Sequence, residues 1–250
     1  MTITSQHNQK LKEIRKLRQR RRWRERTGRF VAEGEDLLAA ADRAGWPALE
    51  RYSAAGSGLG GVEVDPELLA SASGLGSGTR ALAVYEERWA PRAAGPLCVY
   101  LHGVHDPGNV GTILRSAEAF GAGSVALGPG TADPYSPKAV RASMGAVFAV
   151  ALVRVEGDLA ALPGLKIALA PGQGVPLPEA RHDSSAEGDE ASRFPPEVTL
   201  LVGAEREGLP AEVVERADRV VHIPVATDSL NAAMATTVAL YELQIRMAAG

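Results

Sequence analysis

The sequence contains a single cysteine, Cys98, and it has no apolar run long enough to cross a membrane. Because a membrane-spanning helix needs about 18 or more consecutive apolar residues, no such span is expected. One cysteine can form neither an intramolecular disulfide nor a zinc site made of several thiolates. The first residues are polar and then basic, without the apolar segment of a secretory signal. These absences favour a protein of the cytoplasm.

The chain nevertheless has enough apolar material for a sizeable core. Of its 250 residues, 45% are hydrophobic and 23% are charged. This length suits one large domain or two modest ones.

Positive charge is concentrated at the N-terminus. Residues 1–30 carry eleven lysines and arginines against two glutamates, a net charge of +9, whereas the rest of the chain has a net charge of −12. Apolar residues recur every three positions in this run, at Leu11, Ile14 and Leu17. The pattern predicts a basic helix with one apolar stripe, and Trp23 and Phe30 add aromatic surface that could pack or stack on bases. The expected partner is nucleic acid. A solvated helix or tail without a partner, or a helix lying on a membrane surface, are the alternatives.

The rest of the sequence predicts two domains. A small α/β domain, with helices at 33–44 and 66–71 and strands at 49–52 and 81–85, is expected within residues 1–90, and residues 91–96 read as a linker. Beyond the linker, in residues 97–250, apolar strands alternate with helices. The predicted strands are 97–101, 124–127, 165–170, 198–202 and 219–223, and the predicted helices are 111–120, 138–143, 211–216 and 230–247. Alternation of this kind is typical of a parallel sheet covered on both faces.

One segment does not fit this pattern. Residues 172–197 are rich in glycine, proline, serine and acidic residues, and they are much longer than an ordinary connection. We interpret the segment as a flexible surface insertion, with a substrate lid as the alternative.

Ligands of parallel sheets bind beyond the carboxyl ends of the strands, so functional groups are expected in the loops that follow the strands. The loop after the strand at 97–101 contains Asn109, which is placed to cap the following helix. Arg115 lies off the apolar face of that helix. It could meet an anionic ligand or form an ion pair with Glu118.

Two later loops also follow apolar strands. In one, Gly203 and Gly208 frame Glu205, which would suit close approach of the backbone to a ligand or simply a tight turn. This loop has neither the Lys-Ser/Thr of a Walker A loop nor the glycine spacing of a dinucleotide site. In the other loop, Ser229 and Asn231 present polar groups at a helix N-terminus, for a ligand or for ordinary capping. No histidine stands at a spacing that would suit a serine hydrolase.

Together these loops resemble the motifs of the SpoU/TrmH family of RNA ribose 2′-O-methyltransferases, within the SPOUT class. The resemblance rests on Asn109-Val-Gly-Thr-Ile-Leu-Arg115-Ser-Ala-Glu-Ala-Phe-Gly121, on Gly203-x-Glu205-x-x-Gly208-Leu209, and on Ile223-Pro224 followed by Ser229-Leu230-Asn231. Residues 139–148 also look like the family's, and the basic N-terminal region is similar to its ribosomal-protein-like RNA-binding domain. The departures are Ala204, where many relatives have asparagine, and the insertion at 172–197.

The resemblance implies a parallel α/β sheet with a C-terminal trefoil knot, and a homodimer whose active sites draw on both subunits. It implies S-adenosylmethionine as cofactor, held largely by backbone groups, and no metal. The cofactor positions of the family correspond to Val202, Gly203, Ile223, Pro224, Leu230 and Asn231. The catalytic positions correspond to Arg115, with Asn109, Glu205, Ser229 and Asn231 orienting it, the ribose and the cofactor loops. RNA is expected to contact the basic region at Arg15, Arg18, Arg22 and Arg29.

The expected reaction is transfer of a methyl group to a ribose 2′-hydroxyl of RNA. A separate substrate domain with a basic N-terminus favours ribosomal RNA over transfer RNA. A non-catalytic RNA-binding or ribosome-assembly protein of the same fold is one alternative. A small-molecule α/β enzyme with an incidental basic region is another.

Overall fold

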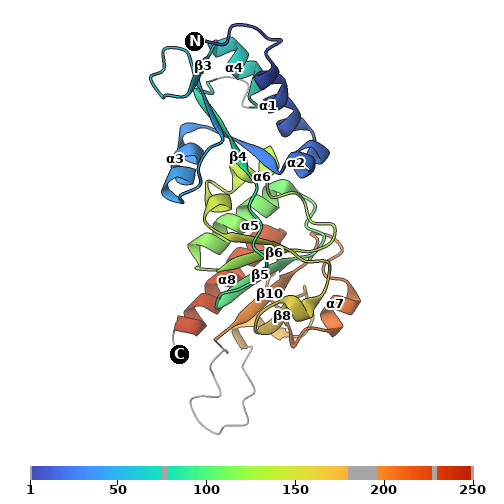
Figure 1. Ribbon diagram of the computed structural model, residues 1–250. Helices are drawn as coiled ribbons and strands as arrows, with labels where there is room; N and C mark the ends of the chain where they lie inside the picture. Colours follow the sequence, from blue (N-terminus) through green and yellow to red (C-terminus); the bar gives the residue numbers. More distant parts are fainter. Residues whose placement is uncertain (1, 75–77, 180–195, 227–229, 249–250) are drawn as a thin grey trace. The chain divides into compact units, whose positions relative to one another are not determined.

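The computed structural model describes residues 2–74, 78–179, 196–226 and 230–248 (Figure 1). The chain divides into two compact units. Unit 1 comprises Met1–Arg88 together with Asp133–Ala149, and unit 2 comprises Trp89–Ala132 and Val150–Gly250. The chain first passes from unit 1 to unit 2 after Arg88, close to the expected linker at 91–96. Residues 133–149, however, pack with unit 1, although they lie within the range 97–250 that was expected to form the second domain.

Unit 1 is built on a four-stranded sheet with the order β1-β4-β2-β3. Its strands are β1 (Arg29–Glu33), β2 (Glu50–Ala54), β3 (Val62–Val64) and β4 (Ala81–Glu86), and its helices are α1 (Gln9–Gln19), α2 (Arg21–Thr27), α3 (Glu35–Arg43), α4 (Pro66–Ala72) and α6 (Pro137–Ala142). Strand β4 is antiparallel to β1 and β2, whereas β2 and β3 are parallel.

The basic N-terminal run folds as two short helices. The side chain of Asn8 caps α1 by accepting from the Lys10 amide, and Gly28, with φ of 61°, ends α2 in the left-handed conformation. The predicted apolar stripe is confirmed, since its three members are fully buried against the sheet of unit 1: Leu11, Ile14 and Leu17. The basic residues of α1 lie off this stripe, and of them Lys10 and Lys12 are exposed.

Residues 133–149 are attached to unit 1 by an aromatic cluster and by a buried ion pair. The cluster consists of Phe30, Trp46, Tyr85, Tyr135 and Phe148, and its closest rings, those of Phe30 and Tyr135, have centroids 4.6 Å apart. Phe30 is completely buried in this cluster, so it packs and presents no surface to a base. Arg24 on α2 is also buried, and it pairs with Asp133 at 2.6 Å.

Unit 2 contains a seven-stranded sheet in which every pairing is parallel, with the order β7-β6-β5-β10-β8-β11-β9. The strands are β5 (Leu97–Leu101), β6 (Ser124–Leu127), β7 (Ala151–Arg154), β8 (Leu165–Leu169), β9 (Val175–Pro176), β10 (Val198–Val202) and β11 (Arg219–His222). The predicted parallel α/β architecture is therefore confirmed. Strands β7 and β9 were not predicted.

The start of the expected insertion belongs to the sheet. Strand β9 pairs with β11, and Leu177, which follows in a short 3₁₀ helix (Leu177–Glu179), is buried. The interpretation of residues 172–179 as part of a flexible insertion was therefore wrong, because a two-residue strand leaves almost no pattern in a sequence. Residues 180–195 lie outside the described residues.

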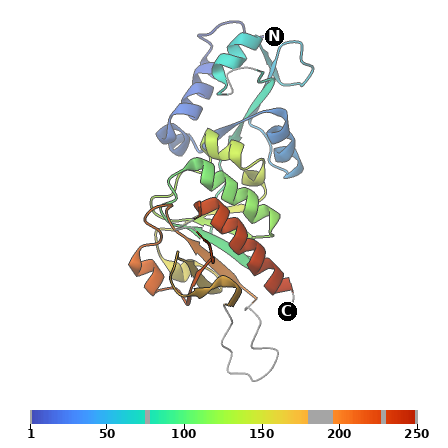
Figure 2. The same ribbon diagram turned by 180° about the vertical axis from the view of Figure 1, so that it is seen from behind.

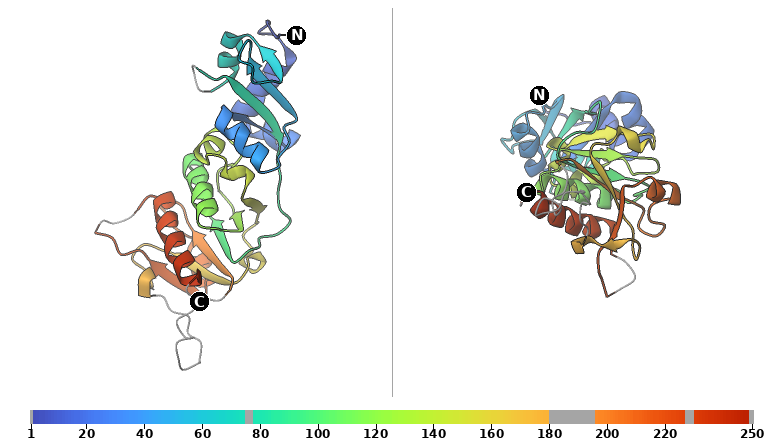
Figure 3. Two further views of the ribbon diagram at one scale, coloured as in Figure 1. Left: turned by 90° about the vertical axis from the view of Figure 1, so that its left-hand side faces the viewer. Right: turned by 90° about the horizontal axis from the view of Figure 1, so that it is seen from below.

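Helices cover both faces of the sheet in unit 2. Helices α5 (Pro107–Ala119) and α8 (Ala232–Ala248) lie side by side on one face (Figures 2 and 3). The other face packs against a 3₁₀ helix (Leu159–Ala161) and α7 (Ala211–Glu215), with Val213 and Leu209 in the shared core. No helix of the described residues is both long and apolar enough to span a membrane.

Candidate active site

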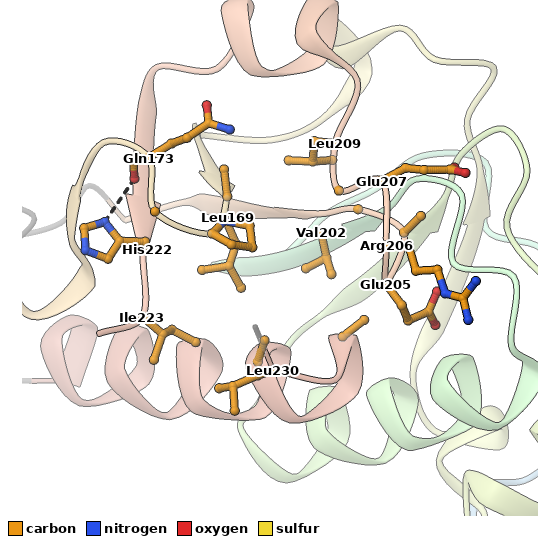
Figure 4. A pocket seen from close by; sticks show the side chains of 18 of the residues that line it. Leu169, Gln173, Val202, Glu205, Arg206, Glu207, Leu209, His222, Ile223 and Leu230 are labelled. Atoms are coloured by element: carbon orange, nitrogen blue, oxygen red, sulfur yellow. Dashed lines mark hydrogen bonds between the residues drawn. The ribbon is translucent and has the colours of Figure 1, made fainter. Parts of the chain in front are cut away.

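A cavity of about 890 Å³ opens at the carboxyl ends of β8, β10 and β11. The apolar side chains of Leu169, Val202, Ile223 and Leu230 converge on it from four different segments (Figure 4). Its position is the one expected for ligands of a parallel sheet, and its volume lies within the range of small-molecule sites.

The loop after β10 is closed by the backbone. Ala204 and Gly208 exchange two hydrogen bonds of 3.0 Å each, and Gly208 has a φ of 69°, which favours glycine. Gly203 packs against this closure so tightly that a Cβ there would lie 2.1 Å from the carbonyl carbon of Gly208. The loop therefore needs glycine at 203, and Glu205 stands at its tip beside the cavity.

Three predicted catalytic residues are joined by hydrogen bonds. Asn109 of α5 donates from Nδ2 to Oε1 of Glu205 at 2.5 Å, and Asn231 donates from Nδ2 to Oδ1 of Asn109 at 3.1 Å. Asn231 also caps α8, because its Oδ1 accepts from the amides of Ala233 and Met234 at 2.9 and 3.3 Å. This Glu205–Asn109–Asn231 chain links the loop after β10 to the starts of α5 and α8.

The structure corrects one assignment in this chain of hydrogen bonds. Asn109 was expected to cap α5, but the helix starts at Pro107, four residues before the predicted start at 111, and Asp106 caps it by accepting from the Gly108 amide at 2.8 Å. Proline suits the first helical position because it has no N–H to leave unpaired. Asn109 lies inside the first turn, where its amide is free to meet Glu205.

Most residues at predicted cofactor positions surround the cavity. Those that line it are Val202, Gly203, Ile223, Pro224 and Leu230. Asn231 is not among the lining residues, but it is connected to Glu205 through Asn109. Ser229 lies outside the described residues, so its predicted role stays a prediction.

Arg115 stands apart from this group. It is exposed on α5, does not line the cavity, and makes no hydrogen bond or ion pair with any residue that the structure describes, Glu118 included. It lies six positions beyond Asn109, which corresponds to about 9 Å along the helix at ~1.5 Å per residue. The fold alone therefore does not bring Arg115 to the cavity of its own chain.

Sequence reasoning missed other residues that line the cavity, among them Leu169, Gln173 and His222. His222 donates from Nδ1 to the carbonyl of Gln173 at 3.1 Å, which holds the segment after β8 against β11 (Figure 4). The available signal was positional, because Leu169 and His222 end two of the predicted parallel strands.

Burial shifts the pKa of two groups on or next to β5. It raises the pKa of the Cys98 thiol, and it lowers the pKa of His102 below its ordinary value even though Glu212 acts in the opposite direction. Both groups are therefore neutral near pH 7. Within the residues described, no three or more His, Cys, Asp or Glu side chains are grouped so that they could hold a metal ion.

The four arginines predicted to bind RNA differ in their surroundings. Arg18 is mostly buried, where it pairs with Glu33 and donates to a backbone carbonyl at 2.7 Å. Arg15 is half-buried and donates to a backbone carbonyl at 3.2 Å. Arg22 and Arg29 are exposed. Arg18 is therefore engaged in holding unit 1 together, and Arg29 lies 3.7 Å from a carboxylate oxygen of Glu13, whereas Arg22 has no ion pair among the residues described.

A parallel sheet with a ligand-sized cavity at its carboxyl edge and a polar hydrogen-bonded wall defines an α/β protein with a small-molecule site. The model of the SpoU rRNA Methylase family matches residues 96–241, and that of the MRM3-like substrate binding domain matches residues 8–74. The chain belongs to the SpoU rRNA methylase family, as its motifs predicted.

The similarity to known proteins extends over almost the whole chain. The 23S rRNA (guanosine(2553)-2′-O)-methyltransferase RlmP of Bacillus subtilis is 27% identical, over 97% of this chain and 98% of its own length. An AdoMet-bound rRNA methyltransferase from Sinorhizobium meliloti superposes with a TM-score of 0.83 at 31% identity, covering 98% of this chain and 97% of its own. AviRb from Streptomyces viridochromogenes, in complex with AdoMet, gives 0.80 at 25% identity, covering 98% of this chain and all of AviRb.

Proposed function

We propose that this protein transfers a methyl group from S-adenosylmethionine to a ribose 2′-hydroxyl of ribosomal RNA. Family membership and the full-length similarity to RlmP support this reaction and this substrate. The structural observation that carries the proposal is the Glu205–Asn109–Asn231 chain of hydrogen bonds, which forms a polar wall beside the cavity.

The cavity fits the cofactor. Its volume is large enough, its lining at Leu169, Val202, Ile223 and Leu230 is apolar, and Gly203, whose missing side chain permits the closed loop after β10, is one of the lining residues. Polar side chains, among them Gln173, Glu205 and His222, also line the cavity, so polar contacts are available from side chains as well as from backbone groups. When bound, S-adenosylmethionine supplies an electrophilic methyl group.

The protein must position the ribose and balance the charge that develops as the hydroxyl loses its proton. Asn109 fixes Glu205 by a short hydrogen bond, and Asn231 fixes Asn109, so the wall is organised before RNA arrives. Arg115 supplies positive charge for the RNA phosphate and the developing alkoxide. An arginine stays protonated in proteins and is therefore a poor proton acceptor.

Arg115 reaches an active site by dimerisation. Helix α8, which packs beside α5, exposes an apolar stripe at intervals of four, three and four residues: Met234, Val238, Tyr241 and Ile245. Such a stripe next to Arg115 suits a partner surface. In the homodimer, Arg115 of one protomer completes the cavity of the other.

Two further features of the family are part of the proposal. The C-terminal segment is threaded as a trefoil knot, which is supported by the convergence of the loops after β10 and β11 on one cavity. The protein acts in the cytoplasm, which is supported by its proposed ribosomal RNA substrate.

The test is transfer of labelled methyl groups from S-adenosylmethionine to ribosomal and transfer RNA taken from cells that lack this protein. Label at a ribose 2′-O position in ribosomal RNA, lost in Arg115→Ala, is the expected result. Label in transfer RNA alone would overturn ribosomal RNA as the substrate in favour of transfer RNA. Absence of cofactor binding would overturn the enzyme assignment in favour of a non-catalytic RNA-binding protein.

A further inference from the structure

The basic residues of the N-terminal run differ in whether a carboxylate lies beside them. Five of them lie within 4.0 Å of a carboxylate, in the pairs Lys10–Glu50, Arg18–Glu33, Arg21–Glu25, Arg24–Asp133 and Arg29–Glu13. Their charges are balanced within unit 1. An RNA phosphate would have to compete with these carboxylates, so the paired cations gain least from binding RNA.

A second group gathers around Trp23. The Nζ of Lys16, on α1, lies 4.5 Å from the centroid of the Trp23 ring, and the Cζ of Arg26, on α2, lies 3.8 Å from it. Neither cation has a carboxylate partner among the residues described. The indole thus holds two cations from different helices at fixed positions.

The two charges of this group are close enough to repel each other. Both lie against one ring, so Lys16 Nζ and Arg26 Cζ are separated by at most about 8 Å, which is roughly one Debye length at physiological ionic strength. A polyanion that meets both cations removes this repulsion and releases its own counterions.

Trp23 is suited to holding cations rather than to stacking on a base. The Arg26 guanidinium already lies against the ring at stacking distance. The edge of the indole is buried against the apolar core of unit 1, and its Nε1 has no hydrogen-bond partner there. The ring is therefore anchored by packing.

We propose that Lys16, Trp23 and Arg26 form a clamp, the Trp23 clamp, that binds the phosphate backbone of the RNA substrate. Lys12, exposed one turn before Lys16 on the same face of α1, extends it. The clamp rests on the proposed function, because it takes RNA as the partner. Neither Lys16 nor Arg26 is among the four residues that the sequence analysis predicted to contact RNA.

The test compares cations of the clamp with paired cations in the same helices. Lys16→Ala and Arg26→Ala are matched by Lys10→Ala and Arg21→Ala, and the dissociation constant for purified 23S rRNA is measured over a series of salt concentrations. Each clamp variant should lower the slope of log affinity against log salt by about 0.7 to 0.9, as expected for one lost phosphate contact. The paired controls should leave it unchanged. Equal slopes in all four variants would overturn the clamp in favour of diffuse attraction.

Trp23→Leu tests the ring itself, because both charges remain. It should weaken RNA binding several-fold while cofactor affinity and kcat at saturating RNA stay near wild type, and the thermal midpoint should fall by a few degrees because the ring packs against the core of unit 1. Wild-type RNA affinity in this variant would overturn the role of the ring. If all clamp variants weaken binding to phosphatidylserine vesicles and none weakens binding to RNA, the partner of the clamp is a membrane surface and not RNA. If the clamp variants lose RNA affinity but the wild-type protein methylates no RNA, the clamp stands and the proposed function is refuted.

Discussion

Asn109 and Glu205 are joined by a hydrogen bond of 2.5 Å, although they are 96 residues apart in the chain. The bond connects the first turn of α5 to the closed loop after β10, and Asn231 adds the start of α8. Three segments that approach the cavity from different directions are thus held in one arrangement. Each of the three hydrogen-bonded residues can be tested separately, since each lies on a different segment.

Asn109→Ala should lower kcat by about 10-fold to 100-fold, because Glu205 loses the donor that orients it and small displacements of reacting groups are costly. The affinity for S-adenosylmethionine should change only a few-fold, since Asn109 does not line the cavity. Steady-state kinetics and calorimetric binding check the two quantities. Thr112→Ala, which removes a hydrogen bond to the Gly108 carbonyl in the same helix, is the control and should retain kcat.

Asn231→Ala should reduce both rate and cofactor affinity, because the side chain caps α8 as well as holding Asn109. Loss of a helix cap costs about 1 kcal/mol, so the thermal midpoint should also fall by a few degrees. Asn231→Asp keeps an acceptor for the cap but loses the donor to Asn109, and it should restore stability without restoring the rate. An unchanged cofactor affinity in Asn231→Ala would refute this placement.

Gly203→Ala should abolish cofactor binding, because the added Cβ would meet the backbone of Gly208 and Leu209 at 2.1 to 2.3 Å and the loop would have to open. Isothermal titration with S-adenosylmethionine measures the effect. Gly208→Asn is the matched variant, because asparagine tolerates positive φ and a Cβ there meets nothing within 4 Å. It should bind the cofactor within a few-fold of wild type, and a similar loss in both variants would show that the whole loop is sensitive.

The parallel sheet could be predicted because its central strands are continuous apolar runs, as at β5 and β10, whose residues are all buried. The edge strands could not. Strand β9 has only two residues, and β7 has an exposed residue at each end, so neither gives a periodic signal. The start of α5 was misplaced for a different reason: Asp106 and Asn109 are both good caps, and only the structure shows which one faces Glu205.

Site residues were predictable where a motif named them, but their connections were not. No pattern in the sequence pairs Asn109 with Asn231, because the contact depends on how α5 packs against α8. The same holds for Lys16 and Arg26, which meet only because Trp23 lies between them. The attachment of Tyr135 and Phe148 to unit 1 likewise depends on packing over a long distance in the chain.

A fragment of residues 1–90 should be much less stable than unit 1 in the whole protein. Without residues 133–149, Phe30, Trp46 and Tyr85 lose two aromatic neighbours, and Arg24 is left as a buried charge without Asp133. Breaking a buried pair by removal of one partner costs about 3 to 5 kcal/mol. Thermal unfolding by circular dichroism compares this fragment with one in which residues 133–149 are joined to it by a flexible linker. Equal midpoints would show that residues 133–149 are dispensable for unit 1.

Two inactive variants should restore activity when they are mixed, if Arg115 acts in the partner's site. Arg115→Ala damages the residue given to the partner, and Glu205→Gln damages the protomer's own cavity. After unfolding and refolding together, about half of the dimers are mixed. One of the two sites in each mixed dimer combines an intact cavity with an intact Arg115, so about one quarter of wild-type activity should return. Glu205→Gln mixed with Asn231→Ala is the control, since both changes affect the cavity side and no intact site can form. Failure of the first mixture, with mixed dimers demonstrated by mass spectrometry, would place Arg115 in the active site of its own chain.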